Sequence, residues 1–272
     1  MICIHHNDLD GRCAAAIVAK RYPDCMFIET DYKDPVPDID FLLGQDIIIV
    51  DFSYKTEQFN MIYAAAKSVV WIDHHATAKD YPYQSVPGLR DFKDKSMSGC
   101  ELTWNYFYPY AKIPQAVLLV GDYDKWAHKL KDSKLFYEGM KLEENGPSSQ
   151  IWNFLLSDND MLPTIIQNGI TSMRYRDNYC ESLCKDFGYN TSFEGYHVYA
   201  CNQQKFGSQG FGKRMMVYPF CVAYIHNGHK FIVSLYSENK DINVGEIAKR
   251  YGGGGHKGAA GFVCDELPFC KQ

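Results

Sequence analysis

The sequence has no long apolar run, no excess of positive charge and no Cys-x-x-Cys pair. A helix that spans a bilayer needs about 20 mainly apolar residues, and no stretch of this chain approaches that length. The first residues also lack the basic region and the long apolar run of a signal peptide. We therefore expect a soluble, cytoplasmic protein without a membrane partner.

The charge balance limits the kind of nucleic acid that the protein could hold. The chain carries 28 Lys and Arg against 33 Asp and Glu, for a formal net charge of -5. Proteins that grip long duplexes by their phosphates are strongly basic, so we expect no long duplex partner. The ten cysteines form no Cys-x-x-Cys pair, which favours buried free thiols in a reducing compartment over a zinc or redox site.

The sequence does contain enough apolar material for a large core. Of its 272 residues, 46% are apolar and 22% are charged, which is typical of a soluble globular protein. In the first half, short apolar runs alternate with helix-favouring segments, as in βαβ construction. We expect strands at 2–4, 25–28, 45–50 and 68–72, and helices at 12–21, 56–67, 98–106 and 115–127. The pattern predicts an α/β fold with a doubly wound, mainly parallel sheet.

The second half has a different pattern. Residues 148–187 favour helix, with a break expected at Pro163, and strand patterns follow at 196–200, 220–225 and 230–236. Asn227-Gly228 lies between the last two and is a strong hairpin signal. A helix at 244–250 then runs into four glycines at 252–255. We expect a first domain at 1–160, a helical linker at 161–188 and a second, smaller α/β domain at 189–272.

Acidic and histidine residues follow three of the predicted strands. In an open parallel sheet, ligands bind beyond the carboxyl ends of the strands, so these side chains should meet in one place. A further acidic cluster closes the apolar run at 117–120. Each residue alone has a simpler explanation, such as a helix N-cap for an aspartate or a buried hydrogen-bonded histidine. The residues concerned are His5, His6, Asp8, Asp10, Asp51, Asp73, His74, His75, Asp122 and Asp124.

Carboxylates and imidazoles without thiolates suit Mn²⁺ or Mg²⁺ better than structural zinc. Several carboxylates in one place would repel one another and raise their own pKa values unless cations lay among them. About two divalent ions would neutralise four such charges, and a pair of ions can clamp the attacking and leaving oxygens of a phosphoryl transfer. The sequence therefore predicts hydrolysis at a two-metal site.

In order and spacing, the clusters at 6–11, 51, 73–75 and 122–124 resemble the four motifs of the DHH (Asp-His-His) phosphoesterases. The segment 252–261, with its Gly-Gly-Gly-His sequence, resembles the glycine-rich motif of the DHH-associated C-terminal domain. The resemblance covers almost the whole chain. The length of the chain and this glycine motif are similar to those of the nano-RNases and cyclic-nucleotide phosphodiesterases known as NrnA and NrnB.

The resemblance implies roles for particular residues. Two divalent ions, Mn²⁺ in the first place and Mg²⁺ as an alternative, would be held by one set of side chains, with Asp51 as the bridge. A hydroxide between the ions would be the nucleophile, and His75 would lie near the scissile phosphate. The motif register favours His6 over His5 and Asp122 over Asp124. The implied ligands are His6, Asp8, Asp10, Asp51, His74 and Asp122, and the implied substrate-binding residues are Gly253, Gly254, Gly255, His256 and Lys257.

The expected activity is manganese-dependent hydrolysis of short oligonucleotides or cyclic mono- or dinucleotides, by a protein that could form a homodimer. One alternative is a nucleotide phosphatase acting on 3'-phosphoadenosine 5'-phosphate, and another is a nucleotide-binding module that does not hydrolyse. The chain departs from many relatives in having no arginine in the strand before the glycine motif, where Tyr236 lies instead. Lys213, Arg214 and Lys257 are the nearest residues that could supply the missing positive charge.

Overall fold

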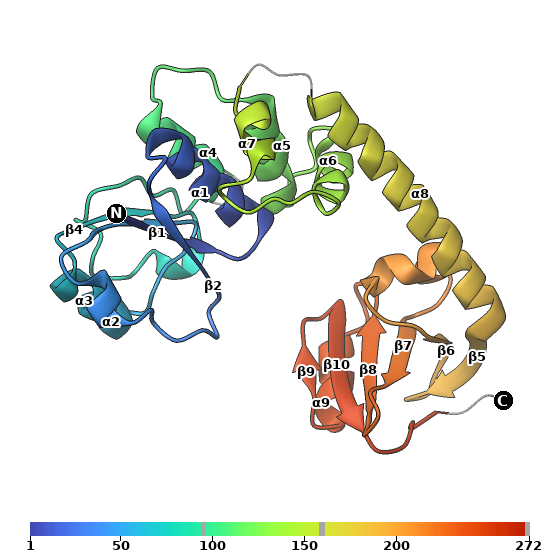
Figure 1. Ribbon diagram of the computed structural model, residues 1–272. Helices are drawn as coiled ribbons and strands as arrows, with labels where there is room; N and C mark the ends of the chain where they lie inside the picture. Colours follow the sequence, from blue (N-terminus) through green and yellow to red (C-terminus); the bar gives the residue numbers. More distant parts are fainter. Residues whose placement is uncertain (94–95, 158–160, 270–272) are drawn as a thin grey trace. The chain divides into compact units, whose positions relative to one another are not determined.

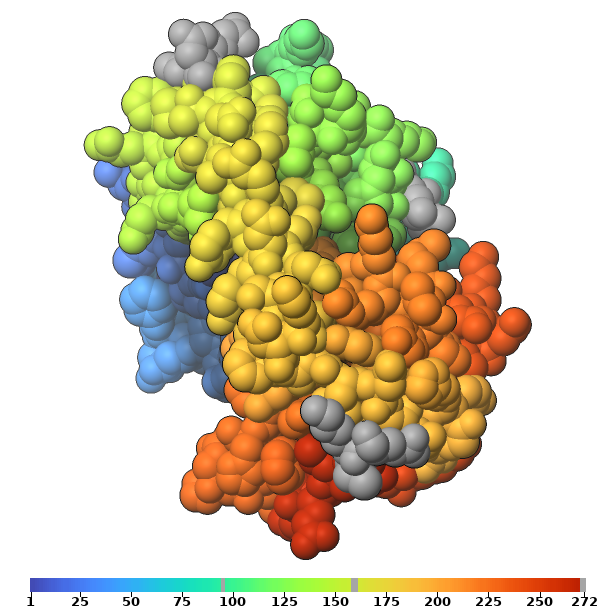
Figure 2. Space-filling view, turned by 90° about the vertical axis from the view of Figure 1, so that its right-hand side faces the viewer, coloured from blue at the N-terminus to red at the C-terminus, as the bar shows by residue number. Residues whose placement is uncertain are grey.

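The computed structural model describes residues 1–93, 96–157 and 161–269. The chain forms two compact units, Met1–Ser172 and Met173–Gln272. The division falls within one long helix, α8 (Met161–Phe187), which Figure 1 shows in yellow. Much of the surface of α8 is open to solvent (Figure 2), and Tyr175 near its middle is 73% exposed. The mixed α/β architecture in two parts confirms the predicted fold class.

The first unit is built on a parallel sheet of four strands. These are β1 (Ile2–His6), β2 (Met26–Thr30), β3 (Asp46–Val50) and β4 (Ser68–Ile72), in the order β2-β1-β3-β4. All pairs are parallel, with Ile2 opposite both Met26 and Ile47. The strands lie where the sequence predicts them, within a few residues at each end.

Helices cover both faces of this sheet (Figure 1). Ile47 and Ile49 of β3 point to one face and pack with α3 (Thr56–Ala65), whereas Ile48 and Val50 point to the other and pack with α1 (Leu9–Arg21). A strand that is buried on both faces is apolar at every position rather than at every second one. This explains the unbroken run from Ile47 to Val50 and confirms a doubly wound sheet.

The other helices of the first unit lie between β4 and α8 or follow β2. Ser98 opens α4 with a capping box, in which its backbone N–H donates to Glu101 Oε2 at 2.8 Å. The break expected at Pro163 is absent, because Pro163 is the third residue of α8 and a first-turn N–H has no acceptor within its helix. These helices are α2 (Ile39–Leu42), a 3₁₀ turn (Ala76–Ala78), α4 (Gly99–Phe107), α5 (Gln115–Asp124), α6 (Ser133–Met140) and α7 (Gln150–Leu155).

The second unit is a mixed sheet of six strands in the order β5-β6-β7-β8-β10-β9. Neighbours are antiparallel except for β6 and β7. One face packs on α9 (Val244–Arg250) and the other on a 3₁₀ segment (Gly207–Met216). The sequence predicted β6, β7, β8 and α9 but not the other three strands. The strands are β5 (Gly188–Phe193), β6 (Tyr196–Asn202), β7 (Cys221–His226), β8 (Phe231–Tyr236), β9 (Gly254–Gly255) and β10 (Ala259–Cys264).

None of the helices in the described ranges has both the length and the apolar character that crossing a bilayer demands.

Candidate metal centre

Asp51 lies directly after β3 and is the centre of the cluster. Its side chain is 1% exposed, and neither of its carboxylate oxygens has a hydrogen-bond partner among the described residues. Its backbone is left-handed, with φ of 54°, a conformation that aspartate adopts more readily than most residues. The first residue of α4 must be small here, since a Cβ on Gly99 would lie 2.5 Å from Asp51 Cβ. The start of α4 therefore packs directly against a carboxylate that makes no hydrogen bond to the described residues.

The candidate ligands form three overlapping groups around this carboxylate. In each group the nitrogen and oxygen atoms lie within 4.8 Å of one another. Asp51 belongs to two groups and His74 to two, so the three sets join into one cluster. The groups are His6, Asp8 and Asp51; Asp51, His74 and His75; and Asp10, His74 and Asp124.

His74 connects two of these groups. Its Nε2 lies 3.2 Å from Asp51 Oδ1 and 3.4 Å from Asp124 Oδ2, yet it makes no hydrogen bond to any described residue. A buried polar atom without a partner costs free energy unless a ligand satisfies it. The two Asp51 oxygens and this nitrogen are thus three buried atoms without hydrogen bonds to described residues, and they lie close together. Imidazole nitrogen and carboxylate oxygen are ligand atoms that suit divalent cations. The residues present therefore fit the metal ions that the sequence predicts.

Asp8 and Asp10 come from the start of α1. Asp8 accepts a hydrogen bond from Gly11 N at 2.9 Å through one oxygen, as an N-cap does, and lies 2.8 Å from His6 Nδ1 through the other. It is thus both a helix cap and a member of the cluster. His5, the alternative to His6, is buried and its Nδ1 lies 2.8 Å from the His6 carbonyl oxygen. Of the two histidines, only His6 is in the cluster.

The N-terminus of α4 fixes the orientation of Asp10. The carboxylate accepts hydrogen bonds from Ser98 Oγ at 2.9 Å, Gly99 N at 2.7 Å and Cys100 N at 3.1 Å. Backbone N–H groups at a helix start favour a negative charge. Asp10 is therefore held in one position, 3.7 Å from His74 Nε2.

The register expected for the fourth motif requires a correction. Asp122 points away from the cluster, because its carboxylate accepts hydrogen bonds from Lys129 N at 2.9 Å and Leu130 N at 3.1 Å. Asp124 takes the position beside His74 and Asp10 instead. Successive residues of a helix are about 100° apart around its axis, so two residues separated by two positions face nearly opposite sides. Asp122 shapes the loop after α5, and Asp124 completes the candidate ligand set.

Asp73 has a positioning role that the sequence did not reveal. It is fully buried, and its Oδ1 lies 2.7 Å from His75 Nδ1 and accepts a hydrogen bond from His74 N at 2.8 Å. Ser53 Oγ donates to its other oxygen. Burial would lower the pKa of His75, but the hydrogen bond to Asp73 and the nearby carboxylates raise it to about 9. The one available signal was an aspartate immediately before the two histidines at the strand end.

The protonation of the cluster reflects an excess of negative charge. Burial, followed by the charges of Asp10 and Asp8, raises the pKa of Asp124 to about 8, and the same causes raise that of Asp51 well above its usual value. Burial would raise the pKa of Asp8 too, but the hydrogen bond to His6, the charge of His6 and the hydrogen bond from Gly11 N together outweigh it and lower the pKa to about 2. Cations among these carboxylates would offset the repulsion that raises the pKa values of Asp51 and Asp124.

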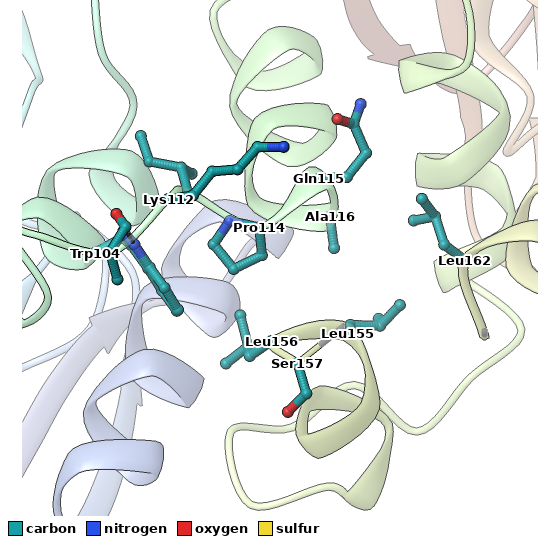
Figure 3. A pocket seen from close by; sticks show the side chains of 11 residues that line it. Trp104, Lys112, Pro114, Gln115, Ala116, Leu155, Leu156, Ser157 and Leu162 are labelled. Atoms are coloured by element: carbon teal, nitrogen blue, oxygen red, sulfur yellow. Dashed lines mark hydrogen bonds between the residues drawn. The ribbon is translucent and has the colours of Figure 1, made fainter. Parts of the chain in front are cut away.

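A larger cavity of about 500 Å³ lies elsewhere in the first unit (Figure 3). Its lining comes mainly from apolar side chains such as Trp104, Leu155 and Leu162, and Lys112 is the charged residue among those that line it. None of the clustered aspartates or histidines reaches it. The candidate metal ligands therefore lie at smaller cavities, whose linings include Asp8 and Asp10.

In the second unit, packing explains part of the glycine motif. A Cβ on Gly253 would lie 2.1 Å from the Gly261 carbonyl oxygen, and Gly255 has φ of 142° with Ala260 close by. Two of the glycines therefore let β9 pair closely with β10. Gly254 has open space at its Cβ position, and the side chains of His256 and Lys257 are exposed. Their binding of phosphate remains a prediction.

Of the three residues considered for the missing positive charge, Arg214 is already engaged. Its guanidinium donates to both carboxylate oxygens of Glu181, at 2.7 and 3.0 Å, and lies 5.0 Å from the centre of the Tyr199 ring. Lys213 and Lys257 are exposed. Arg214 therefore has a structural role within the second unit.

Comparison with known families agrees with this architecture. A model of the DHH family N-terminal domain matches residues 1–122, and a model of the DHHA1 domain matches residues 213–268. The chain thus contains a DHH-family N-terminal domain and a DHHA1 domain. It is 26% identical over 240 residues to the uncharacterized protein R106 of Acanthamoeba polyphaga mimivirus, a match that covers 85% of this chain and 56% of R106. The DHH chain thus spans about half the length of that relative.

Solved structures are similar in fold. The pGpG-specific phosphodiesterase PggH from Vibrio cholerae is 13% identical with a TM-score of 0.55, covering 97% of this chain and 93% of that one. RecJ in complex with Mn²⁺ from Thermus thermophilus is 14% identical with a TM-score of 0.47, covering 97% of this chain and 49% of that one. The likeness to PggH supports the two-part α/β arrangement.

Proposed function

We propose that this DHH protein is a metal-dependent phosphoesterase that hydrolyses phosphodiester bonds in short oligonucleotides or cyclic nucleotides. The observation that carries the proposal is the Asp51 carboxylate, which is buried, has no hydrogen-bond partner among the described residues and belongs to two of the three candidate metal groups. A structural aspartate in such a place would have found donors, as Asp122 has. Asp51 is the residue that can bridge two ions.

The proposed ligand set follows the geometry of the cluster. Divalent ions, when bound, supply positive charge for the phosphate and lower the pKa of water at the site. The contact between His75 Nδ1 and Asp73 fixes the orientation of the ring, so Nε2 is the atom that would face a phosphate oxygen. The candidate ligands are His6, Asp8 and Asp51 in one group and Asp10, His74 and Asp124 in another, and Asp51 also groups with His74 and His75.

The proposed substrate class combines two arguments. The net charge of -5 leaves little attraction for a long polyanion, and the similar PggH structure is described as specific for pGpG, a dinucleotide. In the second unit, the exposed His256 and Lys257 beside the glycine motif are the proposed phosphate contacts. Mn²⁺ is the proposed metal because carboxylate and imidazole ligands suit it, with Mg²⁺ as the alternative.

The test is a substrate panel with a matched pair of variants. Purified protein with Mn²⁺, Mg²⁺ or EDTA is given di- to pentanucleotides, a 20-mer, cyclic dinucleotides and 3'-phosphoadenosine 5'-phosphate, and the products are separated by chromatography. We expect Mn²⁺-dependent cleavage in which the short strands are consumed faster than the 20-mer. Faster degradation of the 20-mer with strong salt dependence would contradict the short-substrate proposal.

Asp51→Asn and Asp46→Asn change the two ends of the same strand. Asp46 pairs with Lys67 and Ser68 at the opposite end of β3, so Asp46→Asn controls for loss of a carboxylate from this strand. Because metal ions contribute several kcal/mol to a phosphoryl transfer and each 1.36 kcal/mol is tenfold, Asp51→Asn should reduce kcat by roughly 1,000-fold or more. Normal turnover and metal content in Asp51→Asn would overturn the two-metal assignment.

A further inference from the structure

A group of three aromatic side chains, Tyr123, Trp126 and Tyr137, adjoins the candidate metal ligands and is not among them. A cavity of about 160 Å³ opens beside Asp8, Asp10 and Asp124, and its other lining residues include Tyr123 and Trp126. Pockets that enclose a whole small ligand measure roughly 300–1,000 Å³. This cavity therefore has room for one part of a ligand. It lies where the rest of a ligand would extend from a phosphate held at the candidate metal ligands.

Trp126 is the exposed member of this aromatic group. Its side chain is 63% exposed, whereas the other tryptophans, Trp71, Trp104 and Trp152, are buried. Its neighbours Tyr123 and His128 meet it edge-on, at interplanar angles of 66° and 68°. Among the described residues, no aromatic ring lies parallel to Trp126, so the indole can still accept a flat partner. Tyr137 in the same cavity is engaged, since Tyr123 stacks on it at 3.8 Å and Lys141 Nζ lies 4.8 Å from its centre.

The backbone that presents Trp126 is held in an unusual conformation. Trp126 has φ of 52° and His128 φ of 48°, which is uncommon for bulky residues. Hydrogen bonds stabilise the bend, from Trp126 N to the Tyr123 carbonyl at 2.9 Å and from Lys129 N to the Asp122 carboxylate at 2.9 Å. Strained backbone of this kind persists where the surrounding structure fixes it, commonly at ligand sites. The loop after α5 therefore holds an apolar ring in solvent beside the phosphate chemistry.

We propose that Trp126 is a specificity-determining residue, onto which a nucleobase stacks when the attached phosphate lies at the metal cluster. The inference rests on the proposed function and deepens it, because it assigns recognition of the base of the nucleotide to a particular side chain. Every nucleobase has a flat face, so stacking tolerates different bases and selects for the presence of a base. Asp122, which fixes the loop, is a positioning residue for this contact.

The first test compares substrates with and without a base. Dinucleotides and matched dinucleotides that are abasic at one position or the other are hydrolysed with Mn²⁺ by the wild-type protein, Trp126→Ala, Trp126→Phe and Tyr110→Ala. Tyr110 is fully exposed and lies outside the metal cluster and this cavity, so Tyr110→Ala controls for loss of a surface aromatic. Base–aromatic stacking is worth roughly 10-fold or more in binding. The quantity compared is kcat/KM for the normal dinucleotide divided by kcat/KM for the abasic one. We expect this ratio to fall by about that factor in Trp126→Ala, mainly because KM for the normal dinucleotide rises. In Trp126→Phe the ratio should recover in part.

The outcomes separate this inference from the proposed function. If the wild-type protein cleaves the dinucleotides but the ratio is the same in Trp126→Ala, the stacking inference is wrong and the phosphoesterase proposal stands. If the wild-type protein cleaves none of these substrates, both fail.

A second measurement needs no turnover. Trp126 is the exposed tryptophan of the protein, so a stacked base should quench its fluorescence. Titration with a nucleoside 5'-monophosphate and Mg²⁺ should quench the wild-type protein and not Trp126→Phe, whereas ribose 5-phosphate, with the same phosphate and sugar, should quench neither. Equal quenching by the nucleotide and by ribose 5-phosphate would overturn the inference.

Discussion

Variants of the two aspartates at the end of α5 test the geometry of the cluster most directly. The Asp122 carboxylate accepts hydrogen bonds from the loop after α5, and Asp124 Oδ2 lies 3.4 Å from His74 Nε2. We expect Asp122→Asn to destabilise the fold and leave metal binding intact. We expect Asp124→Asn to abolish metal-dependent stabilisation and leave the fold intact.

The magnitude for Asp122→Asn follows from its two hydrogen bonds. An asparagine keeps one acceptor oxygen, but its NH₂ group would face a backbone N–H of Lys129 or Leu130, where two donors meet. Hydrogen bonds to charged groups contribute roughly 1.5–3 kcal/mol each, so the free energy of unfolding should fall by about 2–3 kcal/mol. Each kcal/mol corresponds to a melting temperature lower by roughly 2–4 °C for a unit of this size.

Asp124→Asn should act with the opposite sign in the absence of metal. Burial and the charges of Asp10 and Asp8 raise the pKa of Asp124 to about 8, so above that pH the ionised carboxylate destabilises the folded state. Its removal should raise the melting temperature of the metal-free protein. An ion at 100 times its Kd stabilises the folded state by about 2.7 kcal/mol, and Asp124→Asn should lose most of that stabilisation at the same Mn²⁺ concentration.

The assay is thermal unfolding in EDTA and across an Mn²⁺ titration, with bound metal measured by elemental analysis. The two variants differ by position alone, so each serves as the control for the other. A folded Asp122→Asn that has lost the Mn²⁺-dependent stabilisation, with Asp124→Asn retaining it, would refute the geometric argument. That result would restore the register that the motif resemblance favours.

Two further predictions concern the second unit and pH. His256→Ala should leave metal content unchanged and lower kcat/KM for a dinucleotide, whereas His229→Ala, in an exposed hairpin of the same unit, should change neither; loss of metal from the His256 variant would contradict the proposed role. The metal-free protein should become less stable as pH rises from about 7 to about 9. In that range folded Asp124 (pKa about 8) and His75 (pKa about 9) retain protons that the unfolded chain has released. Mn²⁺ should flatten this dependence, and a melting temperature that is constant or rises with pH in EDTA would contradict it.

The sequence predicted best those strands in which the burial of each residue is visible in its side-chain type. Strands buried on both faces require unbroken apolar runs, so β3 and β4 were found almost to the residue. Strands that pair at an edge or through small residues give no such signal. β5 has the sequence Gly-Tyr-Asn-Thr-Ser-Phe, which is mainly polar, and β10 begins with the small residues Ala-Ala-Gly. Neither sequence predicts a strand.

The same limit applies to the site. The clustered ligands after β1, β3 and β4 could be predicted because the ends of parallel strands meet at one edge. The choice between Asp122 and Asp124 depends on the rotation of α5 about its axis, which is set by packing far from the motif. Trp126 gave no signal, because its exposure depends on a left-handed residue that a sequence pattern does not reveal.

The candidate metal ligands lie at the ends of packed helices and strands, whereas Trp126 lies on an exposed loop. The cluster is fixed by helix starts that press on strand ends: a Cβ on Gly11 would lie 2.4 Å from the His6 carbonyl oxygen, and one on Gly99 would meet Asp51. A preformed cluster of this kind loses little freedom when a cation binds. Trp126 instead lies on an exposed loop, held mainly by Asp122 and local hydrogen bonds. Because loops tolerate substitution better than packed elements, changes within residues 125–130 could alter which substrate is bound while the ligands stay in place.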